Sequence, residues 1–411
     1  MKKSTLIIFL CFLSLNLLSQ KDTIFWFATP SLSTVSSTQF DRPTFLKFST
    51  FNQAATITIS MPANATFNPI SINIPANSHN SINMTPYIDQ IESKPSNAVL
   101  NLGLLIKSSS IITAYYEAEG YSYANPDIFT LKGKNSLGKT FYIPFQNYSR
   151  NCDTDYGCEG SSFDIIATED NTVVYINPKN NIDGHNANIE FSVILNKGQV
   201  YSAKASGRLA IDHLGGSKVT SNKPIAITIK DDLTNNFADG FCQDLIGDQM
   251  IPVEKLGSDF ILVKGDLNVN DRFYVCATQP NTTISVDNVL VSTINEGQMY
   301  SGSFSGNTAY IITSSPVCIL HITGYGCEVG GAIIPPLACT GSKEIVLSRT
   351  TDENFSLMLI VKSVGINNFT LNNNASLIPS TAFSPVNGTS NVWSYAKISY
   401  SSASLPANSF I

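Results

Sequence analysis

Apolar and polar residues alternate along most of this chain in short runs that end at Asn, Asp, Gly or Pro. Residues 172–176 read Thr-Val-Val-Tyr-Ile, residues 225–229 read Ile-Ala-Ile-Thr-Ile and residues 283–286 read Thr-Ile-Ser-Val. β-Branched and aromatic residues in such runs are typical of half-buried strands. Residues 85–92 give the one good helical pattern, with Thr before Pro at the first helical position. The pattern therefore predicts an all-β fold.

Three phrases occur twice in the same order along the chain. The middle phrase is Asn-Lys-Gly-Gln-Val-Tyr-Ser at 196–202 and Asn-Glu-Gly-Gln-Met-Tyr-Ser at 295–301. The flanking phrases lie at 167–172 and 277–282, and at 219–225 and 312–317. Equivalent positions are 93 residues apart at Val219 and Ile312, and 113 apart at Ile106 and Val219. A repeat of this kind predicts duplicated structural units and favours a binding or structural protein.

The period of about 100 residues sets the expected architecture. Seven short strands in about 100 residues is the size of a β-sandwich, whereas a propeller blade of the WD type repeats at about 40. We therefore predict tandem β-sandwich-like repeat modules, with a large-bladed β-propeller as the alternative. The predicted boundaries are a signal peptide at 1–20, β repeats at 21–137, 138–255 and 256–340, and an incomplete fourth repeat at 341–411.

Composition and the N-terminus indicate an exported protein. Lys2 and Lys3 precede the largely apolar segment 6–18, which is shorter than a membrane span and typical of a signal peptide cleaved near Gln20. No later segment is long and apolar enough to cross a bilayer. Charged residues make up 14% of the chain and the net charge is −6, which gives no electrostatic reason to bind nucleic acid. We expect a secreted or cell-surface-associated protein.

Eight cysteines occur in the chain, of which Cys11 lies in the signal peptide, so an odd number remains. Export permits disulfides. Cys152 and Cys158 flank a short turn-rich loop, and Cys327 and Cys339 bracket a Gly- and Pro-rich segment. We predict these two bonds. Cys276 and Cys318 are left open: they could pair with each other, one could pair with Cys242, or both could be buried thiols.

The candidate site with the strongest chemistry is an acidic stretch between the second and third repeats. It contains the carboxylates Asp231, Asp232, Asp244 and Asp248. Oxygen ligands of this kind could hold calcium in an exported protein. The competing interpretation is structural, because Asp is an ordinary turn and capping residue that accepts bonds from nearby backbone amides. No other cofactor and no catalytic residue is predicted.

Several phrases resemble one known family. They are Asp-Leu-Ile-Gly-Asp-Gln at 244–249, Gly-Gly-Ala-Ile-Ile-Pro-Pro at 330–336 and Ser-Asn-Lys-Pro-Ile-Ala at 221–226. Over residues 25–411 the chain resembles the IgGFc-binding protein N-terminal domain, a module found in secreted proteins of Bacteroidota-type bacteria and in a mucin-associated animal protein. The resemblance implies an extracellular binding module. Fc binding itself belongs to the animal member.

The function predicted from these observations is non-enzymatic adhesion or recognition of an extracellular protein or glycan. The alternative is a carbohydrate-active hydrolase that uses carboxylates of the 231–248 region. We expect function to lie in parts that do not repeat: the Cys152 loop, the 231–248 connection and the 324–339 segment.

Overall fold

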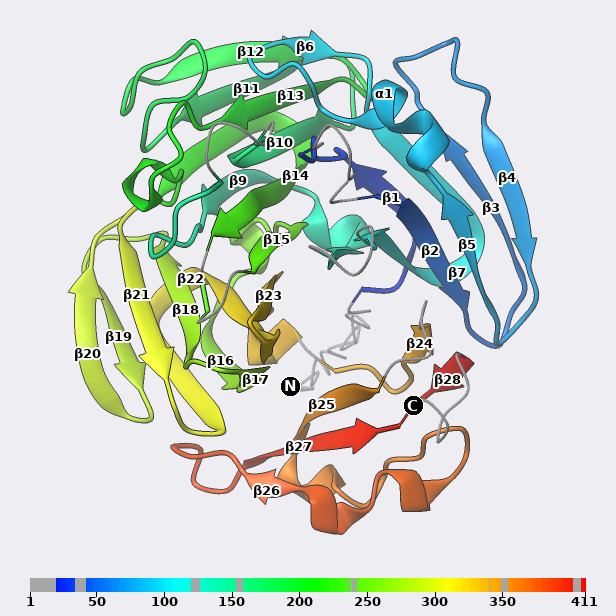
Figure 1. Cartoon of the computed structure of the whole chain (residues 1–411), viewed down its shortest axis with the longest axis vertical. Helices are drawn as coiled ribbons and strands as arrows, with labels where there is room; N and C mark the ends of the chain where they lie inside the picture. Colours follow the sequence, from blue (N-terminus) through cyan, green and yellow to red (C-terminus); the bar gives the residue numbers. More distant parts are fainter. Residues whose placement is uncertain are drawn as a thin grey trace, which may run out of the picture.

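The computed structural model describes residues 20–33, 42–119, 126–152, 158–235, 237–238, 242–339, 341–348, 354–401 and 408–411. The expected signal peptide, residues 1–20, falls outside this part of the chain apart from Gln20. The described residues form an all-β protein, as predicted. Four groups of strands are arranged around a centre, in chain order, and β24 lies against β2, so the fourth group meets the first (Figure 1).

The first unit is built from β1 (Asp22–Phe27), β2 (Thr44–Thr50), β3 (Ala55–Ser60), β4 (Ile70–Ile74), β5 (His79–Asn83), β7 (Leu104–Ala118) and β8 (Asp127–Leu131). The strand β7 is long enough to serve two layers. Its first half pairs with β1 and β3, and its second half pairs with β2 and β8. Apolar side chains from both layers, such as Ile57 of β3 and Phe48 of β2, share one core. The unit is therefore a sandwich whose two layers share a strand.

The second unit repeats this plan with β9 (Gly138–Ile143), β10 (Ser161–Ala167), β11 (Thr172–Asn177), β12 (Phe191–Leu195), β13 (Val200–Lys204), β14 (Ser217–Asn235) and β15 (Gln243–Gln249). The shared strand is β14, which pairs with β9 and β11 first and with β10 and β15 further along. One short strand of the first unit, β6 (Val99–Leu100), joins this sheet beside β13.

The third unit uses β16 (Gly257–Val263), β18 (Asp271–Ala277), β19 (Thr282–Val286), β20 (Val289–Ile294), β21 (Met299–Phe304), β22 (Thr308–Gly326) and β23 (Glu328–Ile333). Here β22 is the shared strand, paired with β16 and β19 and then with β18 and β23. The short strand β17 (Asp266–Leu267) is an addition. Three copies of one strand order agree with the repeat seen in the sequence.

The last part of the chain is organised differently. A three-stranded sheet joins β25 (Phe355–Lys362), β27 (Trp393–Tyr400) and β26 (Ser384–Pro385), and β24 (Val346–Ser348) pairs with β28 (Asn408–Phe410). Within the described residues no long strand is shared between two layers in this unit. The predicted domain boundaries stay a prediction, and β6 crosses one of them by joining the second sheet from within residues 21–137.

Helical structure in the described residues is short. The sequence pattern at 85–92 forms η1 (Thr85–Tyr87) and α1 (Ile88–Ile91). The remaining single turns of 3-10 helix are η3 (Gly133–Ser136), η5 (Ala210–Asp212), η6 (Val253–Lys255), η7 (Leu337–Cys339), η8 (Ser363–Gly365), η9 (Ala375–Leu377) and η10 (Ser380–Ala382). Among the described residues, no helix has the length and apolar character that crossing a bilayer requires.

Candidate binding site at the seams between units

The four predicted site carboxylates lie on two paired strands. Asp231 and Asp232 belong to β14, and Asp244 and Asp248 belong to its neighbour β15. All four are at most 3% exposed. Such buried charges are costly unless they are paired or hydrogen-bonded. Their partners therefore decide what these residues do.

Two of the carboxylates bind side chains and amides near the end of β14. Asp231 accepts hydrogen bonds from the side-chain amides of Gln146, at 2.8 Å, and Asn151, at 2.7 Å. Asp232 accepts from both the amide, at 2.7 Å, and the hydroxyl, at 2.5 Å, of Ser33 in the first unit. These bonds hold loops against β14, so both aspartates have a structural role.

Asp248 connects three units. Its carboxylate forms a buried ion pair with Lys132 at 2.6 Å and accepts a bond from the Thr130 amide at 3.1 Å, both from the first unit. It also accepts from the amide of Ile333 in the third unit at 2.9 Å. The position of this residue follows from the packing of β15 against both β8 and β23. Asp248 thus serves as a junction between units.

Asp244 faces a second acid. Burial, followed by a hydrogen bond with Glu328 of β23, raises the pKa of Asp244 to about 9. Nearby, burial holds the pKa of Asp127 on β8 well above its usual value. A carboxyl with a raised pKa is protonated at neutral pH and can donate a hydrogen bond to its neighbour. Asp244 can therefore supply the proton of a hydrogen bond to Glu328.

These partners do not gather the four aspartates around one ion. Within the described residues, the group of His, Cys, Asp or Glu side chains whose ligand atoms lie within 4.8 Å of one another is Cys242, Cys327 and Glu328. It contains none of the four predicted residues. Calcium binding stays a prediction, and the hydrogen bonds given above support the structural interpretation.

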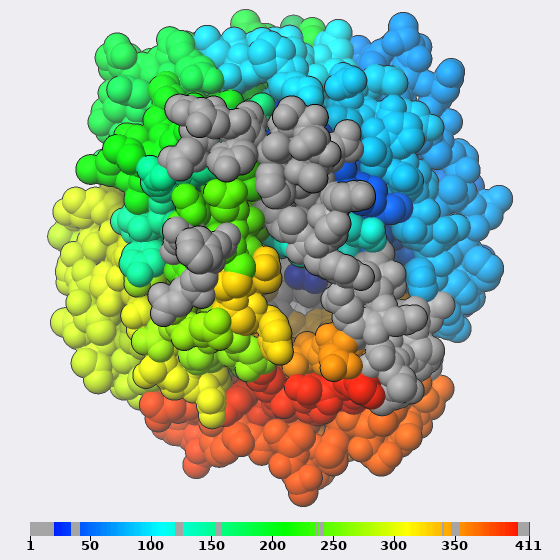
Figure 2. All heavy atoms as spheres, viewed as in Figure 1, coloured from blue at the N-terminus to red at the C-terminus, as the bar shows by residue number. Residues whose placement is uncertain are grey.

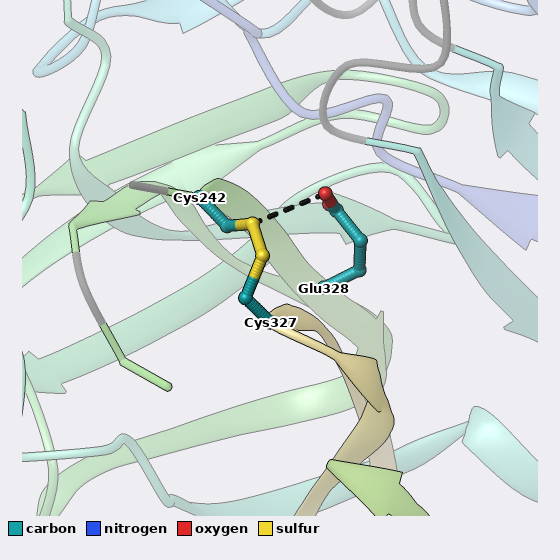
Figure 3. Close-up of side chains that lie close together, drawn as sticks. All are labelled: Cys242, Cys327 and Glu328. Atoms are coloured by element: carbon teal, nitrogen blue, oxygen red, sulfur yellow. Dashed lines mark hydrogen bonds between the residues drawn. A yellow bond between two sulfur atoms is a disulfide. The ribbon is translucent and has the colours of Figure 1, made fainter. Parts of the chain in front are cut away.

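Within the part of the chain that the structure describes, there are two disulfides. Cys152 bonds Cys158, the pair that the sequence predicts. The predicted bond between Cys327 and Cys339 is wrong, because Cys327 bonds Cys242 instead. Figure 3 shows this bond, with the Glu328 carboxylate 3.2 Å from the Cys242 sulfur. The packing of β15 against β23 brings the two cysteines together from positions 85 residues apart.

Cys276 and Cys318 are buried and unbonded, one of the possibilities that the sequence left open. They lie opposite each other on β18 and β22. Burial raises the pKa of the Cys276 thiol to about 12 and that of Cys318 well above its usual value. Thiols with such pKa values are not reactive as nucleophiles.

The repeated phrase lies where one unit meets the next. In its first copy, the carbonyl of Gly198 accepts a bond from the Gly103 amide at 3.0 Å, and the Tyr201 hydroxyl donates to Asn97 at 2.8 Å. In its second copy, Glu296 binds the hydroxyl of Tyr142 and pairs with Lys218. Each copy therefore docks its unit on the preceding unit. Figure 2 shows the second unit, in green, in contact with the third unit, in yellow, on this face.

Among the described residues, three cavities lie at these seams. One, of about 370 Å³, lies between the first and second units and is lined by Ser31, Ser93, Lys94, Pro95, Ser96, Glu159, Ser202, Lys204 and Lys230. Two others, of about 500 and 210 Å³, lie between the second and third units. Residues of the second copy of the repeated phrase, including Gly297, line both. The two larger cavities have volumes typical of small-ligand sites.

Local sequence patterns did not predict the cavities at the seams. We expected function in segments that do not repeat, whereas the repeated phrase and the strand after it contribute to the cavity walls. The residues of the first cavity come from positions 31 to 230, so no local motif contains them. The repeat is the one signal in the sequence that could have indicated these cavities, because its middle phrase lies at the contact between units.

A family model described as IgGFc binding protein matches residues 128–409. No curated protein matches the chain.

Proposed function

The chain belongs to the IgGFc binding protein family, and from this premise we propose that it is an exported, non-enzymatic protein that recognises a protein or glycan ligand outside the cell. Membership of a binding-protein family supports recognition as the activity. The ligand is not transferred from the family name, because function resides in a site and not in a fold.

The observation that carries the proposal is the position of the cavities. All three have walls from two successive units. Ligand sites occur preferentially at such junctions, because two separately shaped surfaces form a concave space there. We propose the seams as the recognition surface.

The carboxylates of the 231–248 region support a non-enzymatic function over the hydrolase alternative. Glycoside hydrolysis needs two carboxyl groups that face the scissile bond. Asp231 and Asp248 are buried and already engaged by amides and by Lys132. These contacts indicate that the two carboxylates stabilise the fold.

A binding screen tests the proposal. The purified chain, immobilised through a C-terminal tag, would be exposed to an array of glycans and to host proteins that include antibody Fc. We expect saturable binding to at least one member, lost after heat denaturation. Absence of binding to every member would contradict the proposal. Export is checked separately: N-terminal sequencing of the mature protein should begin near Lys21.

A further inference from the structure

The two copies of the repeated phrase are covered to different degrees. In the first copy, residues 200–202 are buried, each at most 4% exposed. In the second copy, the corresponding Met299 and Tyr300 are half-buried and Ser301 is exposed. Because the two local sequences are nearly the same, the difference comes from what the preceding unit places against the phrase.

A short strand of the first unit covers the phrase at the first seam. Strand β6 pairs with β13 in antiparallel register, with Leu100 opposite Val200. Next to this pair, the Asn97 amide donates to the carbonyl of Ser202 at 3.0 Å. Residues 97–100 therefore add an edge strand of the first unit to the sheet of the second.

The corresponding edge of the third unit is unpaired. Strand β21 ends its sheet, and among the described strands it pairs with β18 alone. Met299 and Ser301 occupy the positions that Val200 and Ser202 hold in β13, so their backbone groups point away from β18. A free edge of this kind accepts a further strand.

A side-chain donor is also left over at the second seam. At the first seam, Gln199 accepts from the Asn196 amide through Oε1 and donates through Nε2 to Asn101, both at 2.8 Å. Gln298 repeats the first bond, with the Asn295 amide at 2.8 Å, but its Nε2 has no partner among the described residues. Gln298 is exposed, so a ligand can reach this atom.

The cavity of about 500 Å³ lies beside this edge. Its lining includes Gln298 and Met299 of the third unit and residues of the loop 210–215 of the second. This loop corresponds to the segment with β6, because each ends at the glycine before the shared strand, Gly216 or Gly103. In the second unit it forms η5 instead of an edge strand, and the space stays open.

The lining suits a peptide. Its apolar residues are Phe145, Ala210, Ile211, Ile294 and Met299. Ile211 is 78% exposed and so presents apolar surface to a bound side chain. Lys179 is the one Lys, Arg, Asp or Glu in the lining, and the adjacent Lys218 and Glu296 pair with each other at 2.8 Å. Recognition here therefore depends little on charge.

We propose that this cavity and the free edge of β21 bind an extended peptide of an extracellular protein, which adds to the sheet as β6 does at the first seam. The peptide backbone pairs with Met299 and Ser301. One apolar side chain lies against Ile211, and an Asn or Gln side-chain oxygen accepts from Gln298. The inference rests on the proposed function, since it names the ligand class for one of the seams.

The chain supplies its own probe, because residues 96–102 (Ser-Asn-Ala-Val-Leu-Asn-Leu) include β6. A fluorescein-labelled peptide of this sequence would be titrated with the full chain and followed by fluorescence anisotropy. We expect saturable binding that Asn101→Ala in the peptide weakens about two- to tenfold. Leu100→Pro in the peptide should weaken it at least about tenfold, because proline has no N–H for the ladder. Absence of binding, or equal binding of the Leu100→Pro peptide, would overturn the inference.

Gln298→Glu in the full chain places the binding at the second seam. Glutamate keeps the oxygen that accepts from the Asn295 amide but lacks the N–H donor, so the variant should fold and bind the peptide about two- to tenfold more weakly. Gln199→Glu is the matched control, because Gln199 holds the same position at the first seam and bonds the chain's own Asn101. It should leave the peptide affinity unchanged. Equal losses for the two variants would overturn the inference.

Two further measurements separate the possible occupants. Sedimentation of the unmodified chain shows whether the β21 edge pairs with a second copy, and a dimer that Gln298→Glu abolishes would overturn the peptide as occupant. The screen of glycans and host proteins reads the proposed function independently. The chain could therefore bind a partner in that screen while the peptide fails to bind.

Discussion

Gly216 of the second unit and Gly297 of the third lie so close that a Cβ atom on Gly216 would stand 2.3 Å from the carbonyl oxygen of Gly297. Gly297 belongs to the repeated phrase, and both residues have positive φ, at 95° and 69°. The contact shows why the phrase recurs: its turn approaches the preceding unit at backbone distance, where a side chain has no room.

Gly216→Ala should therefore destabilise the protein by about 2–4 kcal/mol, since the substitution adds a backbone collision to the cost of positive φ. Chemical denaturation followed by tryptophan fluorescence measures this loss. Gly326→Ala is the control, because Gly326 also has positive φ, at 62°, but nothing within 4 Å of the added Cβ. It should lose only about 1–2 kcal/mol. Equal losses for the two variants would show that the seam contact is unimportant.

The buried Lys132–Asp248 ion pair offers a second test. Asp248→Asn leaves the Lys132 ammonium buried without its counter-charge and should cost about 3–5 kcal/mol. Adding Lys132→Met removes that charge, so the double variant should be more stable than the sum of the single losses by about 1–3 kcal/mol. Strictly additive losses would argue against the pairing.

Calcium provides an independent measurement on the same residues. If Asp231, Asp232, Asp244 and Asp248 held calcium, millimolar calcium would raise the melting temperature of the unmodified protein, because a ligand that binds the native state stabilises it. The hydrogen bonds that engage these residues predict no such shift. A calcium-dependent rise that Asp244→Asn and Asp248→Asn abolish would restore the metal site.

The strands and the repeat could be predicted from the sequence, because both depend on local pattern. Runs such as Thr172–Asn177 have their strand preference built into neighbouring residues. The cavity between the first and second units could not be predicted in this way. Ser31 and Lys230, which meet there, are 199 residues apart, and their contact depends on how two units dock. The same reason explains the disulfide error: short spacing favoured Cys339 as the partner of Cys327, whereas the packing of β15 against β23 supplies Cys242.

The raised pKa of Asp244 predicts a pH dependence of stability. Its value of about 9 in the folded protein exceeds that of an exposed Asp, near 4, so the folded state binds more protons than the unfolded state between these values. Stability should therefore fall as pH rises from about 4 to about 9, by at most about 1.4 kcal/mol per pH unit from this group. Urea denaturation across that range measures the slope.

Asp244→Asn should flatten this slope, because the amide keeps a donor for Glu328 but has no proton to lose. Asp89→Asn is the control, since the Asp89 side chain is 96% exposed. It should leave the slope unchanged. An Asp244 variant with the slope of the unmodified protein would contradict the assignment of the hydrogen-bond proton to Asp244.

The two disulfides should differ in their contribution to stability. Cys242 and Cys327 are 85 residues apart, and Cys152 and Cys158 are six apart. A bond that closes a longer loop restricts the unfolded chain more, so chain entropy predicts about 4–5 kcal/mol for the first and about 2 kcal/mol for the second. Paired substitutions to Ser at each bond, compared by urea denaturation, measure the difference.

Peptide mapping without reduction checks the connectivity on which that comparison depends. Because β15 and β23 pack together and place Cys242 beside Cys327, digestion should release a fragment that joins these two cysteines and separates into two peptides on reduction. The Cys152–Cys158 bond serves as the internal control. A fragment joining Cys327 to Cys339 would contradict the structure, and it would also remove the reason for a larger stability loss in the Cys242→Ser/Cys327→Ser variant, since the loop closed would then be short.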